Sequence, residues 1–316
     1  MTLALVAVLL AAGIAAPHVV DLRHVPAGTA SLLWGAALGM RAACGVLVAG
    51  GLVLLLPTTA VFRALTHWCW HTALPLLATH LGLDGHRLGD AVVLLPAALL
   101  GVSVISISWG VLRAARAVRR ALRRHELGRG PHDSVLVAGR EVVLLAAGLS
   151  HPQVVVSTGA LAALDDEELA AALAHERGHI ARRHRWVLLY GELCRALGVF
   201  LPGGRRATRE LAFHLERDAD AWALRRRHDP LALAGAICKA GHGSAPTPAR
   251  ILLAGSAGTR ERVDELIHGP PPRGLRLTLA RAGAAASVVL LLSLIVALPL
   301  AAASVASAAT LAAPHC

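Results

Sequence analysis

The stretch HERGHIARRH, residues 175–184, holds three histidines and a glutamate. On a helix, His175 and His179 lie one turn apart on one face, so both imidazoles can reach a single metal ion. Glu176 follows the first histidine and can reach a water at that ion as a general base. This HExxH pattern predicts hydrolysis by a zinc-activated water.

A catalytic zinc needs a third protein ligand and keeps its fourth position for water. His184 lies about 140° from His179 around a straight helix. The residues between them also lack the glycine turn that lets one segment supply three histidines. We therefore interpret His184 as a solvated histidine at the end of the helix.

The third ligand is expected further along the chain, in the stretch FHLERDADAW. Glu216 and Asp220 lie four residues apart on one helical face, so one can bind the metal while the other holds a ligand imidazole by its second nitrogen. Asp218 points elsewhere. His214 is the rival ligand, but it lies about 160° from Glu216 on the helix and has no partner acid one turn away. We favour Glu216 as the ligand and Asp220 as its supporting acid.

Helices must hold these residues. Asp165 and Glu168 form a capping-box pattern, further acids follow in the first turn, and arginines gather at the far end, which predicts a helix over 166–184. Short Val- and Leu-rich runs before it predict two or three strands. The remaining predicted elements are a strand over 153–158, helices over 207–227 and 231–240, and a short helix within TRERVDELIHGPPPRG. The strand at 153–158 offers an edge on which an extended substrate could pair.

The composition predicts a membrane protein. The chain of 316 residues is 55% hydrophobic and 16% charged, with a mean hydropathy of +0.59, which is too apolar for an ordinary soluble domain. We expect an α-helical integral membrane protein carrying a mainly α, α+β zincin-like domain at 113–275. Four stretches are long enough to span a bilayer, at 3–20, 31–56, 91–112 and 284–303.

Two of these stretches need comment. The second contains Arg41, near enough to one end to snorkel. The first could instead be a cleaved signal peptide, but no positive residue precedes its apolar run, so we treat it as a membrane helix.

The charge distribution predicts the orientation. Most of the 31 Lys and Arg behind the net charge of +11 lie between the third and fourth stretches, and arginine-rich flanks adjoin both. The domain is therefore expected to face the cytoplasm, at a cell membrane crossed several times, with anionic lipid at the basic flanks. No recognition motif or aromatic stacking residues accompany the charge, so nucleic acid is not an expected partner.

Other candidate metal or redox sites are weaker. The five cysteines are scattered without a CxxC pair, which argues against a disulfide framework and a cysteine zinc site. HWCWH, residues 67–71, is typical of an interfacial aromatic belt. One Zn²⁺ per chain is the expected cofactor.

The run AAGLSHPQVVVSTGALAALDDEELAAALAHERGHIARRH, followed by LERDADAWAL and RVDELI, resembles the BlaR/MecR-type membrane zinc metallopeptidases and, more distantly, the HtpX- and Ste-type CAAX peptidases. The resemblance covers about 143–267 and the layout of three helices before the domain and one after. It implies a zinc site with the ligands His175, His179 and Glu216, the base Glu176 and the supporting acid Asp220.

Two departures from the relatives matter. Where relatives often have an aspartate, this chain has His184, which we expect to tune packing and leave catalysis alone. The sequence also ends soon after the fourth predicted helix, so the extracellular penicillin-binding sensor of the BlaR proteins is not expected, and a β-lactam receptor role is not supported.

The predicted function is that of a membrane-embedded zinc metalloendopeptidase, which cleaves a regulator or a membrane protein at the cytoplasmic face. His228 and Tyr190 are noted as candidates for oxyanion stabilisation. Two alternatives stay open: a membrane receptor or scaffold with a structural zinc, and an HtpX-like quality-control protease. Glu176 argues against the scaffold, because a structural zinc site has closed coordination and needs no base.

Overall fold

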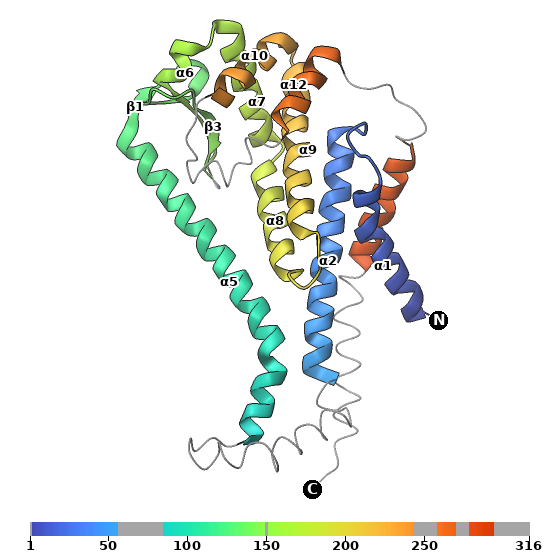
Figure 1. The fold of residues 1–316 in the computed structure, drawn as a ribbon. Helices are drawn as coiled ribbons and strands as arrows, with labels where there is room; N and C mark the ends of the chain where they lie inside the picture. The colour runs from blue at the N-terminus through green and yellow to red at the C-terminus, as the bar shows by residue number, and fades with distance from the viewer. Residues whose placement is uncertain (1, 56–84, 149–150, 243–257, 270–277, 294–316) are drawn as a thin grey trace.

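The computed structural model describes residues 2–55, 85–148, 151–242, 258–269 and 278–293 (Figure 1). The first helices are α1 (Thr2–Val19), α2 (Ala27–Leu55) and α5 (Gly85–His125). The strands are β1 (Glu126–Arg129), β2 (Val135–Val137), β3 (Leu144–Ala147) and β4 (Gln153–Ser157), with the short η3 (Pro131–Asp133) after β1. The later helices are α6 (Thr158–Ala163), α7 (Asp166–Ala181), α8 (His184–Leu197), α9 (Gly204–Arg225), α10 (Pro230–His242) and α12 (Thr259–His268). A further apolar helix covers Thr278–Ser293.

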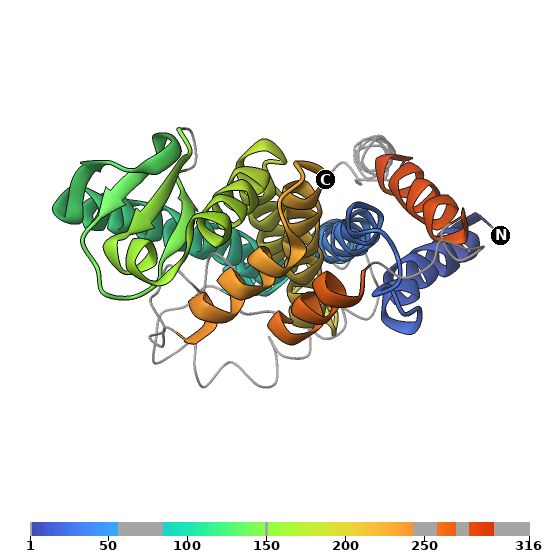
Figure 2. The same cartoon turned by 90° about the horizontal axis from the view of Figure 1, so that it is seen from above.

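These elements lie in successive layers, from the sheet through α7 and α9 to α2 and then α1 (Figure 2). Helix α9 packs against α7 on one side and α2 on the other. Buried apolar side chains fill the layer between α2 and α9, among them Trp34, Leu38, Leu211 and Leu215. Burying this surface holds the α8–α9 hairpin along α2. The packing therefore joins the second predicted membrane segment, 31–56, to the predicted domain.

The turn between α8 and α9 touches the middle of α2. A Cβ atom on Gly45 would collide with the Leu197 carbonyl oxygen, so the contact requires a glycine there. Arg41 is 3% exposed, its Nε lies 3.4 Å from the Pro202 carbonyl oxygen, and its Nη2 lies 2.7 Å from Nε2 of His18. The snorkelling prediction for Arg41 was therefore wrong, because the α8–α9 turn and α1 enclose its charged end.

Within the described residues, one helix, Ala27–Val53, is long and apolar enough to cross a bilayer. About half of its apolar window, 56%, is buried inside the protein, and the core helix of a soluble protein passes the same test. The apolar helices Val8–Val19, Ala98–Arg113 and Thr278–Ser293 are shorter. The prediction of four spans is therefore not confirmed; the fourth, 284–303, runs past the described residues, and HWCWH lies outside them.

Helix α5 extends further than the predicted span of 91–112. It is one helix from Gly85 to His125, and its arginine-rich second half leads directly into β1 (Figure 1). The basic segment after the third predicted span is thus helical, and it carries the chain to the sheet.

The sheet has the order β1-β2-β4-β3. Strand β4 pairs in parallel with β2 and antiparallel with β3, so the predicted strand at 153–158 exists but the prediction that it is an edge was wrong. Its residues Val154 to Ser157 are all buried, as expected for an interior strand and not for a half-exposed one. The outer strand on this side is β3, which packs against α7.

The capping box of α7 forms as predicted. The Asp165 carboxylate accepts from the Glu168 backbone N–H at 2.8 Å, and Glu168 accepts from the Asp165 N–H at 3.0 Å. The helix ends at Ala181, earlier than predicted, because Arg183 adopts a left-handed conformation with φ 56°. The chain turns there, and His184 begins α8 instead of ending α7.

Candidate metal centre

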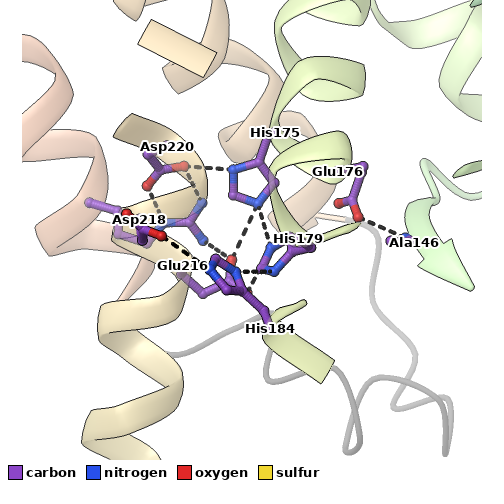
Figure 3. Close-up of polar contacts among 9 residues, drawn as sticks. Ala146, His175, Glu176, His179, His184, Glu216, Asp218 and Asp220 are labelled. Atoms are coloured by element: carbon purple, nitrogen blue, oxygen red, sulfur yellow. Dashed lines mark hydrogen bonds and ion pairs between the residues drawn. The ribbon is translucent and has the colours of Figure 1, made fainter. Parts of the chain in front are cut away.

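Helices α7 and α9 lie side by side and bring three of the predicted residues together (Figure 3). Nε2 of His175 and Nε2 of His179 are 3.1 Å apart. The Glu216 carboxylate oxygens lie 3.5 Å from His175 Nε2 and 3.4 Å from His179 Nε2. One ligand atom from each residue lies within 4.8 Å of the other two. The three atoms converge on one point, as a shared metal ion requires.

Asp220 lies one turn after Glu216 on α9 and contacts the other side of the first histidine. Its Oδ1 is 2.8 Å from Nδ1 of His175. With Nδ1 engaged by a carboxylate, the imidazole is oriented and Nε2 is left to face the cluster. This is the position that the sequence predicted for a supporting acid.

Arg262, on α12, is 4% exposed and bridges both carboxylates. It donates to the two oxygens of Asp220 and to Oε2 of Glu216, each at 2.7 Å. Its charge lowers the pKa of Glu216 to about 2, although burial alone would raise it. The sequence reasoning did not single out Arg262, and the signal available was its place in RVDELI, the last run quoted for the resemblance.

The donor set fits a divalent cation. Zinc binds nitrogen and oxygen ligands at about 2.0–2.2 Å, so neighbouring ligand atoms around it lie a little over 3 Å apart. Glu216 and Asp220 bring two buried negative charges, while Arg262 supplies one positive charge. The two carboxylates raise the pKa of His175 to about 10, although burial alone would lower it. The buried acids thus favour a positive charge at this position, which a divalent cation would supply.

Glu176 lies beside this cluster and faces strand β3 (Figure 3). Its Oε2 accepts a hydrogen bond from the Ala146 backbone N–H at 2.7 Å. Burial raises the pKa of Glu176 to about 7. A carboxylate with a pKa in this range can take and return a proton near neutral pH.

Residues 116–227 match the model of peptidase family M48, and they include HExxH and Glu216. This segment therefore resembles an M48 domain. M48 is a family of metallopeptidases that typically use zinc, so the match indicates a metallopeptidase. The match covers roughly a third of the chain and does not single out the BlaR/MecR group. Comparisons with curated proteins and with solved structures gave no match.

The M48 match ends before Arg262. Helix α12 packs against α10, and α10 packs against α7, through a core that includes Leu233 and Leu266. This packing brings the guanidinium to the carboxylates of α9. A complete cluster therefore needs a helix from beyond the matched segment.

His184 is 2% exposed, so the interpretation as a solvated histidine was wrong. Its Nδ1 lies 3.0 Å from Nδ1 of His179, and its Nε2 lies 3.2 Å from Oδ2 of Asp218. The angle argument failed because the left-handed Arg183 breaks the helix before His184. Asp218 points away from the group formed by His175 and Glu216, but it faces His184 from α9 (Figure 3).

The other candidate residues lie away from the cluster. His214 is buried, and its Nδ1 is 3.1 Å from Arg217, so the rival third ligand is outside the cluster, as the helical angle predicts. The Tyr190 hydroxyl donates to the Gly35 carbonyl oxygen of α2 at 3.2 Å. His228 follows the end of α9, about three turns beyond Glu216. Neither Tyr190 nor His228 has a contact with the cluster among the described interactions.

Proposed function

We propose that the chain is a membrane-associated zinc metalloendopeptidase, in which His175, His179 and Glu216 hold one zinc ion and Glu176 is the catalytic base. The observation that carries this proposal is the convergence of the three ligand atoms next to Glu176. When bound, zinc supplies Lewis acidity that polarises a peptide carbonyl and acidifies a water. The chain's own residues supply the rest of the chemistry.

Glu176 accepts the proton of the attacking water and then passes it to the leaving amine. Its raised pKa of about 7, caused by burial, suits both transfers. Asp220 fixes the orientation of His175, and Arg262 keeps Glu216 ionised as a ligand. Tyr190 and His228 are not assigned a role in stabilising the oxyanion.

The substrate is proposed to be an extended protein or peptide segment that pairs with β3. This strand is paired with β4 on one side, and the Ala146 N–H on its other side points to Glu176. A substrate strand adding to this edge would gain main-chain hydrogen bonds and lie beside the base. It would also compete for the Ala146 N–H and release Glu176 for proton transfer.

The membrane location is inferred from the apolar helix Ala27–Val53 and from the arginine-rich second half of α5. We propose several membrane crossings, with the M48 domain on the cytoplasmic side, near anionic lipid. Substrates are then membrane proteins at that face or a soluble regulator brought to it. Both regulatory cleavage and quality control fit this placement.

The test is Glu176→Gln, with Glu167→Gln, an exposed glutamate in the first turn of α7, as the matched control. Purified full-length protein is expected to bind one zinc and cleave an unfolded test protein. Glu176→Gln should keep the zinc and lose about 10²–10⁴-fold in cleavage rate, while Glu167→Gln should behave as wild type. Unchanged cleavage by Glu176→Gln would refute the assigned base.

The same variant separates the alternatives. In cells, a function that survives Glu176→Gln but not His175→Ala would favour a scaffold with a structural zinc. Proteins trapped on Glu176→Gln and identified by mass spectrometry would distinguish one regulator from many damaged membrane proteins.

A further inference from the structure

Each histidine that faces the metal position has a partner on its second nitrogen. For His175 the partner is the carboxylate of Asp220, on α9. For His179 the partner is the imidazole of His184, at the start of α8. An imidazole in this place is ambiguous, because either of the two facing nitrogens could carry the proton.

Metal binding resolves this ambiguity. To bind through Nε2, the neutral His179 must carry its proton on Nδ1, so that nitrogen is a donor. The facing Nδ1 of His184, 3.0 Å away, must then be the acceptor. The single proton of neutral His184 therefore lies on Nε2, where Oδ2 of Asp218 accepts it at 3.2 Å.

We propose that His184 and Asp218 form a positioning pair, which fixes the ring orientation and the tautomer of His179 as a metal ligand. The proposal rests on the zinc site of the proposed function. The pair draws on two elements, since His184 opens α8 and Asp218 lies on α9. It therefore ties the second ligand to the hairpin that packs along α2.

The surroundings of the pair favour one fixed arrangement. The side chains of His184 and Asp218 are 3% and 13% exposed, so water cannot easily replace either partner. The rings of His179 and His184 meet edge to face, with centroids 4.9 Å apart. Arg182 Nε lies 3.5 Å from Asp218 Oδ2, and its positive charge favours the ionised form of this acceptor.

The test measures zinc affinity by competition with a chromophoric chelator, on the full-length chain in detergent. His184→Leu keeps a side chain of similar bulk but removes the acceptor, and zinc affinity is expected to fall about tenfold to a hundredfold. His184→Asn places an oxygen acceptor near the position of Nδ1, so it should keep most of the affinity. The visible spectrum of the Co²⁺-substituted protein should change in the leucine variant and remain close to wild type in the asparagine variant.

His214→Leu is the matched control, because His214 is an equally buried histidine that contacts Arg217 and not the cluster. It should bind zinc as tightly as wild type. If His184→Leu does not fold, Asp218→Leu provides the second variant and should lower the affinity by removing the acceptor of His184.

The outcomes separate the two proposals. A wild-type protein that binds no zinc would refute the proposed function itself. Wild-type binding combined with equal affinities for His184→Leu and His184→Asn would overturn the positioning pair alone. Wild-type affinity in Asp218→Leu would also overturn it.

Discussion

The two sides of the metal centre hold their histidines by different means. On the His175 side, the supporting group is a charged carboxylate that shares a buried arginine with the ligand Glu216. On the His179 side, the supporting group is the imidazole of His184, and the carboxylate of Asp218 contacts that imidazole instead of the ligand. The His179 side chain is also more exposed, at 17% against 9% for His175.

This difference predicts different consequences for the stability of the fold and for the affinity for the metal. Removing a member of the charged side leaves an uncompensated charge in the interior, and this is among the costliest single changes to a folded protein. Removing His184 on the other side leaves the neutral His179 without its partner and leaves Asp218 still paired with Arg182, which costs less. Changes on the charged side should therefore lower both the stability of the fold and the affinity for the metal, whereas changes on the imidazole side should act mainly on the affinity.

The largest effect is expected from Arg262→Met. Loss of the guanidinium leaves Glu216 and Asp220 buried without their cation, which should lower the free energy of unfolding by about 3–5 kcal/mol in the zinc-free protein. Added zinc should recover part of this loss, because it restores a positive charge beside Glu216. Thermal and denaturant unfolding with and without zinc measures both effects.

Arg217→Met is the control for this prediction. Arg217 pairs with Glu265 of the same helix α12, at 2.5 Å, but Glu265 is 30% exposed and can be solvated when the arginine is lost. A smaller loss, without recovery by zinc, is expected. Equal losses in the two variants would mean that Arg262 matters only for docking α12, and the contrast between the two sides would fail.

A smaller effect, on zinc affinity, is expected from replacing the two supporting acids, Asp220 and Asp218. Asp220→Asn should lower zinc affinity about tenfold to a hundredfold, because Asp220 contacts the ligand His175 itself. Asp218→Asn should lower it less, since Asp218 acts through His184 and an amide oxygen can still accept the proton. Competition titrations on the two variants give the ranking. A larger loss of affinity for Asp218→Asn would mean that the imidazole side, and not the charged side, has the greater effect on metal binding.

The parts of this centre that the sequence could predict are local. Asp165 and Glu168 lie within one turn and form their capping box wherever the helix goes. His175 with His179, and Glu216 with Asp220, follow from the helical repeat alone. These contacts depend on three or four residues of spacing, so a sequence pattern is enough to indicate them.

The parts that could not be predicted depend on breaks and on distant packing. One residue, Arg183, turns the chain and changes His184 from an apparent surface residue into a buried partner of His179. Arg262 reaches Glu216 only because α10 and α12 pack on α7. Strand β4 is interior because β2 and β3 pair with its two sides. The sequence signal for this was the uninterrupted apolar run of β4, residues 154–156.

The smallest effect on zinc affinity is expected from changing the distance between α7 and α9. Gly178 lies on α7 between the two histidines, and a Cβ there would meet Trp222 of α9 at 3.1 Å. Gly178→Ala should push the helices apart by a few tenths of an ångström and weaken zinc binding by less than the roughly tenfold minimum expected for a lost supporting partner.

Stability should not fall with the affinity, because alanine favours a helix by about 1 kcal/mol over glycine. Gly110→Ala on α5, where a Cβ meets nothing within 4 Å, controls for the helix preference alone. Zinc titration together with unfolding separates the two quantities. Unchanged affinity in Gly178→Ala would mean that the partners of the histidines, and not the approach of α7 to α9, set the strength of the site.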